Sequence, residues 1–253
     1  MLFSAYLLFN KRSVNTGQIQ PSEEQVSNPV ELSAVEIKDS PYITLKPRAD
    51  GHEIKMEAQN FGDFQTLEYQ LSYLAKDIPR GVIGQIDLKD KNNQISRDLL
   101  LGSCSKNVCK YDDGVSEGTL MVKLKKDNQV QTQEVAFDLT RGEEAKGGLV
   151  SQDGKFIFKG TLPLSYYMVM NTLGVPKMPQ GEIIAGPYGI FSAMSKNIKG
   201  TVKIKTEKDK ENLIILGWDE TNKGWKEYKS APDGDFVSGE IDRLTTFVLV
   251  KPQ

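Results

Sequence analysis

The sequence has few of the side chains that most often build metal centres and nucleophilic active sites. Its 253 residues include one histidine, His52, and two cysteines, Cys104 and Cys109. Zinc sites take four Cys or His ligands, or three and a water, and a Ser-His-Asp or Cys-His centre needs a histidine as its base. His52 follows a turn signal in ADGHEIK, where we expect an exposed residue at the start of a strand. We therefore expect no metal, no cofactor and no catalytic centre, and predict a protein that is not an enzyme.

A strong charge of one sign is also missing. Lys and Arg number 32 against 34 Asp and Glu, which leaves a net charge of −2. Domains that bind nucleic acid typically carry a clear basic surplus, so we expect no nucleic-acid partner. No spacing singles out a pair of carboxylates for glycoside hydrolysis. An envelope hydrolase is therefore the least favoured of the functions considered.

Helical periodicity is scarce. Only 30–37 could form a turn or two of helix, which Pro41 would end. Elsewhere apolar and polar residues alternate over short runs, as in 67–73, where a period of two indicates a half-buried strand. Runs of this kind, each bounded by Gly, Asp, Asn or Pro, occupy 42–45, 53–57, 67–73, 82–88, 120–124 and 135–139, then 155–159, 166–171, 182–185, 188–192, 201–205, 213–218, 225–229, 236–241 and 246–250.

These runs predict an all-β protein with two domains. Roughly seven strands in about 100 residues, with turn signals between them, are typical of an immunoglobulin-like or fibronectin-like β-sandwich. The charged, glycine-containing segment 142–148 predicts a linker. We therefore expect one β-sandwich domain over 40–141 and a second over 149–253.

The N-terminal region is typical of a tethered protein. Residues 1–12 are mostly apolar and end in Lys11 and Arg12, but they cover only half of the roughly 20 residues needed to span a membrane. Two interpretations remain, the tail of a membrane anchor whose start is missing, or a short apolar leader. Residues 13–39 have the polar composition of a disordered linker. This order predicts an extracytoplasmic protein of a bacterial cell envelope, bound to the membrane through its N-terminal segment.

The two cysteines are separated by four residues, in Cys104-Ser-Lys-Asn-Val-Cys109. Two strand ends joined by so short a connection can bring the Cα atoms within disulfide range. Two alternatives are free buried thiols and a redox dithiol, although redox centres normally have a two-residue spacing at a helix N-terminus. We expect a disulfide, which agrees with an oxidising compartment.

Two segments resemble modules of bacterial extracytoplasmic and surface proteins. In 67–124 the resemblance lies in L-x-Y-x-L-x-Y, R-G-x-x-G and LLLGSCSKNVCKYDDGV, and that module has no assigned activity. In 213–250 it lies in W-D-E-x-x-x-x-W and in a closing strand that follows Asp242. This sequence has Arg243, Leu244 and Thr245 where those modules have His, Phe and Ser. The resemblance implies β-sandwich surface modules, immunoglobulin-like or fibronectin-like.

Aromatic residues of the C-terminal hairpin are the candidate binding residues. Trp218 and Trp225 flank a turn, and Tyr228 follows them. Cross-strand packing explains the three rings, and a sugar-stacking platform is the alternative. The sequence thus predicts a non-catalytic envelope or surface protein with a structural, adhesive or partner-binding role, and alternatively a glycan- or peptidoglycan-binding accessory module. The expected partner is an envelope protein or a glycan.

Overall fold

The computed structural model describes residues 30–32, 35–106, 108–146, 148–194 and 197–252. The predicted apolar segment 1–12 and the part 13–29 of the predicted linker lie outside them. The described chain consists of strands and one three-residue 3-10 helix, Ile37–Asp39, which confirms the all-β prediction. The helical turn predicted over 30–37 is wrong at its start, because Val30–Leu32 forms strand β1 and pairs in parallel with β10. Immunoglobulin-like or fibronectin-like identity stays a prediction.

No helix within the described ranges is long and apolar enough to cross a membrane.

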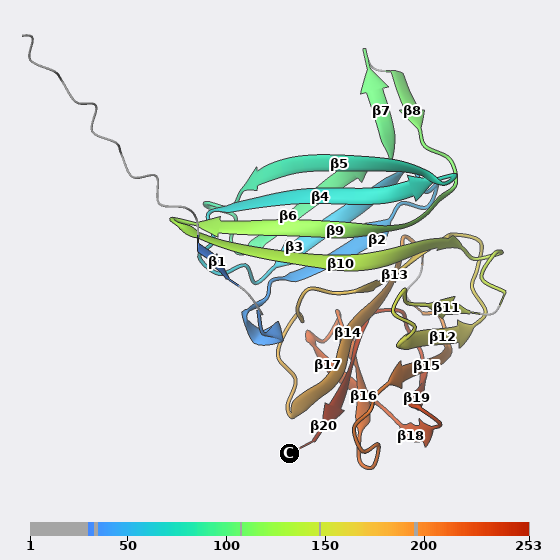
Figure 1. Cartoon of the computed structure of the whole chain (residues 1–253). Coiled ribbons are helices and arrows are strands. Elements are labelled where there is room, and N and C mark those ends of the chain that lie inside the picture. Colours follow the sequence, from blue (N-terminus) through green and yellow to red (C-terminus); the bar gives the residue numbers. More distant parts are fainter. Residues whose placement is uncertain (1–29, 33–34, 107, 147, 195–196, 253) are drawn as a thin grey trace, which may run out of the picture.

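One ten-stranded sheet runs through both halves of the chain (Figure 1). Its order is β17-β16-β20-β14-β13-β10-β9-β4-β5, and β1 lies beside β10. The bounds are β4 Thr66–Ala75, β5 Ile78–Asp87, β9 Val115–Lys126, β10 Gln129–Arg141, β13 Tyr166–Asn171, β14 Glu182–Ser192, β16 Ile214–Asp219, β17 Gly224–Tyr228 and β20 Thr246–Lys251. Nearly all pairs are antiparallel, so short connections join many sequential strands.

Three smaller sheets complete the fold. A three-stranded sheet has the order β2-β3-β6, a five-stranded sheet has the order β11-β12-β15-β19-β18, and β7 pairs with β8 alone. Their bounds are β2 Tyr42–Pro47, β3 Glu53–Gln59, β6 Gln94–Leu100, β7 Gly102–Ser105, β8 Val108–Tyr111, β11 Leu149–Val150, β12 Phe156–Gly160, β15 Gly200–Lys205, β18 Ser230–Asp233 and β19 Phe236–Ile241.

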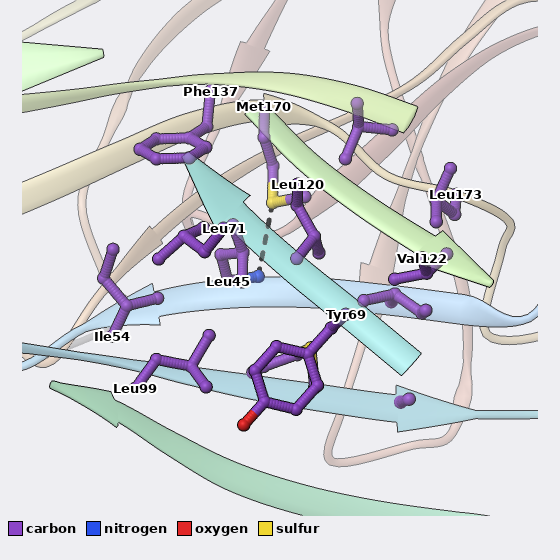
Figure 2. Close-up of a cluster of buried hydrophobic side chains, with 14 of the residues drawn as sticks. Leu45, Ile54, Tyr69, Leu71, Leu99, Leu120, Val122, Phe137, Met170 and Leu173 are labelled. Atoms are coloured by element: carbon purple, nitrogen blue, oxygen red, sulfur yellow. Dashed lines mark hydrogen bonds between the residues drawn. The ribbon is translucent and has the colours of Figure 1, made fainter. Parts of the chain in front are cut away.

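The first core lies between the three-stranded sheet and one face of β4, β9, β10 and β13 (Figure 2). The alternation predicted in 67–73 is confirmed, because Leu67 and Leu71 are fully buried here. Met170 of β13 reaches the same core, and its Sδ accepts a hydrogen bond of 3.2 Å from the Leu45 amide. The first core is therefore completed by a strand from beyond the predicted domain boundary.

The second core lies on the opposite face of the large sheet, under the five-stranded sheet. Strand β13 serves both cores: Met168 and Met170 point into the first, and Tyr167 and Val169 into the second. Side chains alternate between the faces of a strand, so a run that is apolar at every position is buried on both sides.

The predicted division into two separate sandwiches therefore differs from what is observed. Segment 142–148 does connect β10 to β11, but the large sheet continues through both halves, because β10 pairs with β13. The two small sheets cover opposite faces of this shared sheet. The apolar run 166–170 predicts a strand of the second sandwich, but it does not show that the two faces of this strand belong to different cores.

Candidate functional site

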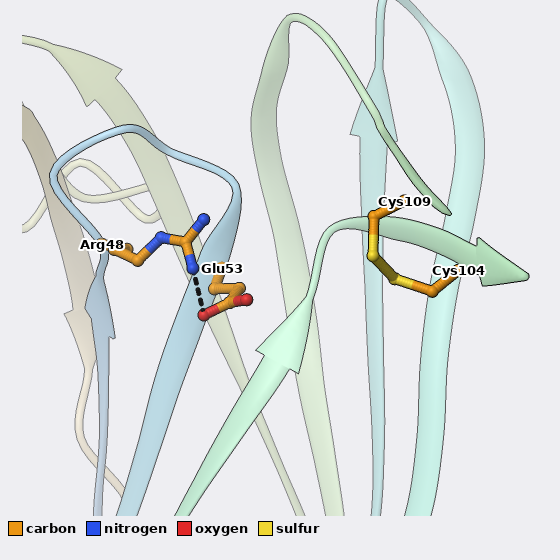
Figure 3. Close-up of a disulfide and its surroundings, with 4 residues drawn as sticks. All are labelled: Arg48, Glu53, Cys104 and Cys109. Carbon is orange, nitrogen blue, oxygen red and sulfur yellow. Dashed lines mark ion pairs between the residues drawn. A yellow bond between two sulfur atoms is a disulfide. The ribbon is translucent and has the colours of Figure 1, made fainter. Parts of the chain in front are cut away.

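The β7–β8 hairpin projects from the sandwich as an arm (Figure 1). Cys104 and Cys109 lie directly opposite each other in its register. They form a disulfide with an S–S distance of 2.03 Å (Figure 3). The predicted disulfide is confirmed, and neither cysteine is free.

The root of the arm is held by side chains and backbone from two neighbouring segments. The ring of Tyr111 stacks on His52, with centroids 3.9 Å apart and planes 4° from parallel. The Leu101 amide donates to the His52 carbonyl over 2.9 Å. On the other side, the Tyr73 hydroxyl donates to the Asp112 carboxylate over 2.8 Å. His52 thus packs at the base of the arm.

Beyond its root the arm contacts no core. The described side chains from Ser103 to Lys106 and from Val108 to Lys110 are all exposed, and Val108 is 74% exposed. Lys106 and Lys110 give this surface a positive charge. An isolated two-stranded hairpin is marginally stable in water, so the cross-link is what keeps the arm ordered. Its exposed residues are therefore available for contact.

The three aromatic residues predicted as binding candidates are divided between two faces of the β16–β17 hairpin. Trp218 and Trp225 are directly opposed, and their rings meet edge to face at 5.5 Å. Tyr228 pairs with Ile215, an odd number of positions away from Trp218, so its ring points to the other face and into the second core. The three rings therefore do not form one platform.

Each of the three rings has a defined partner. The Trp225 indole N–H donates to the Lys177 carbonyl over 2.7 Å. The Tyr228 hydroxyl donates to Asp242 over 2.7 Å. Trp218 is 5% exposed, and its remaining surface lines a pocket that neither of the other two rings reaches.

This pocket, of about 170 Å³, lies between the first and second halves of the chain. Its walls are the outer face of β2 and β3, the end of β14, the β16–β17 turn and the segment between β19 and β20. The residues that line it are Tyr42, Thr44, Lys46, Glu57, Gln59, Ile190, Phe191, Ser192, Met194, Asn197, Trp218, Glu220, Thr221, Arg243, Leu244 and Thr245. Polar side chains and aromatic rings are therefore combined in one recess.

Buried polar groups support the wall around Trp218. Arg243 Nη1 lies 2.8 Å from Asp219 Oδ1. Burial alone would raise the pKa of Asp219, but hydrogen bonds from the Thr221 and Asn222 amides, with the charge of Arg243, outweigh it and hold that pKa below its ordinary value. Asp219 therefore stays ionised, and it fixes both the turn and the Arg243 side chain.

The sequence pointed to only part of this pocket. Trp218 was a candidate, and Arg243 was noted only as a departure from the resembling modules. The sequence does not predict a binding role for Lys46, Glu57 or Gln59, because alternating polar residues in β2 and β3 are typical of a strand face exposed to solvent. The packing of the three-stranded sheet beside the C-terminal hairpin brings them together.

No set of three or more His, Cys, Asp or Glu residues within the described ranges is placed to hold a metal ion. Comparisons of the chain with protein-family models, with curated proteins and with solved structures found no significant match.

Proposed function

We propose that this chain is a non-catalytic, partner-binding protein of a bacterial cell envelope, and that it contacts its partner through the β7–β8 arm. The observation that carries the proposal is the exposed arm itself, cross-linked at Cys104–Cys109 and held at its root by the His52–Tyr111 stack. A pre-organised binding element loses little conformational entropy when it binds. An ordered protrusion that adds nothing to a core is suited to this use.

The same disulfide supports a location outside the cytoplasm, because disulfides persist in oxidising compartments. A tether through the N-terminal segment 1–12 belongs to the same proposal and rests on the apolar sequence alone. The expected partner is a protein or glycan of the envelope. The positive, partly apolar surface made by Lys106, Val108 and Lys110 favours a partner with acidic groups around an apolar contact.

A pair of matched substitutions tests the arm. Val108→Asp places a negative charge at the arm, and Ile83→Asp places the same charge at an equally exposed apolar residue, 78% exposed, on β5. Binding of purified protein to envelope fractions from the organism that encodes the chain is then measured by co-sedimentation. We expect Val108→Asp to reduce binding at least about tenfold, as for a central interface residue, and Ile83→Asp to leave it unchanged. Equal binding by all three proteins would refute a role for the arm.

A further inference from the structure

We propose that the pocket between the β2–β3 face and the β16–β17 hairpin binds a single sugar ring. This site lies apart from the arm and does not depend on the proposed function. Its volume, about 170 Å³, is below the roughly 300–1,000 Å³ of pockets that hold drug-sized ligands. A pocket of this size suits one small ring and not an extended chain.

Two charged side chains on the β2–β3 wall of the pocket, Lys46 and Glu57, have no ion pair with another described residue, and they carry the proposal. In the β2–β3 register Thr44 is opposite Glu57 and Lys46 is opposite Lys55, so Lys46 is the diagonal neighbour of Glu57 on the same face. Both side chains are half-buried. Within the described part of the chain, neither one takes part in a hydrogen bond or an ion pair, and the charge nearest to both along the same face is that of Lys55. A bound group that bridges them would satisfy both.

Neighbouring hydroxyls of a sugar have the required chemistry. A hydroxyl both donates and accepts, whereas a carboxylate only accepts and an ammonium only donates. One hydroxyl of a vicinal pair can donate to Glu57 while the next accepts from Lys46, and hydrogen bonds to ionised groups are the stronger kind. Thr44, Gln59 and Thr221 line the same recess and can engage further hydroxyls.

The charge balance of the pocket favours a neutral ligand. Lys46 and Arg243 are matched by Glu57 and Glu220. Arg243 is already held by Asp219, and Glu220 by Lys223 at 3.0 Å. Among the described residues that line the pocket, no surplus of one sign remains to select an anion or a cation. A ligand with many hydroxyls and no charge fits this lining better than a phosphate or an ammonium compound.

Aromatic side chains supply the apolar wall that a sugar ring needs. Trp218 and Phe191 both line the pocket, and their rings can pack against the C–H face of a pyranose. The edge-to-face contact with Trp225 holds the Trp218 ring in place. Trp225 therefore acts on the site by positioning Trp218, without lining the pocket itself.

The two tryptophans of the chain allow a direct test. The fluorescence of Trp218 and Trp225 in the unsubstituted chain is titrated with D-glucose, N-acetyl-D-glucosamine and N,N′-diacetylchitobiose. Saturation-transfer NMR of the same sugars on the unsubstituted chain gives a second readout that needs no reporter. We expect a saturable response to at least one sugar in both measurements.

Substitutions in the pocket then assign the response. Glu57→Gln and Lys46→Met should each weaken binding about tenfold or more, because each removes a charged hydrogen-bonding partner. Glu134→Gln, an exposed glutamate on β10, is the matched control and should bind as the parent does. Val108→Asp should also bind normally, which separates this site from the arm.

Three results would overturn the proposal. The first is no saturable response to any of the three sugars in either measurement. The second is unchanged affinity in both Glu57→Gln and Lys46→Met. The third is a saturable response to glycine or L-leucine in place of the sugars, since this would assign the Lys46–Glu57 pair to a zwitterion.

Discussion

The β7–β8 and β16–β17 hairpins each have two side chains of one residue type at directly opposed positions. The two hairpins are stabilised by different kinds of interaction. In the first, Cys104 faces Cys109 in a hairpin whose described residues beyond the root are all exposed. In the second, Trp218 faces Trp225 in a hairpin that is part of the large sheet. The exposed hairpin is closed by a covalent bond, whereas the integrated hairpin is closed by ring packing.

The difference follows from what each hairpin can bury. Strand β16 is sandwiched between β17 and β20, and its residues reach the second core on one face and a smaller apolar cluster around Val248 on the other. Its stability is shared with the whole sheet. The arm has no such neighbours, so a cross-link that restricts its open conformations is its main source of order. One hairpin is therefore coupled to global folding and the other is a local unit.

The largest expected effect comes from breaking the packed hairpin. Trp218→Ala should lower the free energy of unfolding by about 3–5 kcal/mol, because a large buried ring leaves a cavity. Trp225→Ala is the comparison and should cost less, since that ring is only half-buried. Chemical denaturation followed by circular dichroism measures both. Equal losses for the two variants would contradict the assignment of Trp218 as the packed member of the pair.

A smaller, local effect is expected in the arm. The double variant Cys104→Ala, Cys109→Ala should lower the free energy of local opening by about 2 kcal/mol, the chain-entropy value for so short a loop. Global stability should change by no more than about 0.5 kcal/mol, as at other surface sites. Amide hydrogen exchange across β7 and β8, read by NMR, checks the first value and chemical denaturation the second. A large fall in global stability would show that the arm is not a local unit.

The smallest expected effect is a pH dependence of stability that the β16–β17 hairpin has and the arm lacks. Lys226 of β17 hydrogen-bonds Asp242 at 2.5 Å, and this contact, with the Tyr228 hydroxyl, overcomes partial burial and lowers the pKa of Asp242 to about 2. A lowered carboxyl pKa contributes stability that is present above about pH 4 and is lost as the pH falls through about 2. The pair is more than a third exposed, so its share is under about 1 kcal/mol.

Asp242→Asn should therefore flatten the acid dependence of stability between pH 4 and pH 2, which denaturation at a series of pH values measures. The disulfide of the arm does not titrate. Exchange in β7 and β8 should thus keep the same pattern in this variant. An acid profile that matches the parent protein would show that Asp242 carries no linked stability.

Much of the strand content could be predicted because alternation is local information. The period of two in 67–73 and the Asp219–Gly224 turn between two tryptophans predict a strand and a hairpin without knowledge of the rest. The sharing of β13 could not be predicted, because an apolar run shows that both faces are covered but not which sheets cover them. Strand β1 was missed because three residues give no periodicity.

The candidate sites were also predictable only where the information is local in sequence. The arm was partly predicted, since two cysteines at a short spacing in a strand-rich region indicate a cross-linked turn. Its projection from the body was not, because exposure depends on where neighbouring strands end. The pocket was missed apart from Trp218, since Lys46 and Arg243 are far apart in sequence and meet only through tertiary packing.

Strand β13 also sets an order of events during synthesis. A chain that emerges from its N-terminus presents β2 to β10 before Met168 and Met170 exist, yet these two side chains fill the centre of the first core. Until they arrive, the Leu45 amide lacks its sulfur acceptor, and the edge of β10 along 137–141 lacks the strand that pairs with it. The N-terminal half therefore cannot reach its final packing early, and completion of both cores depends on the same short strand.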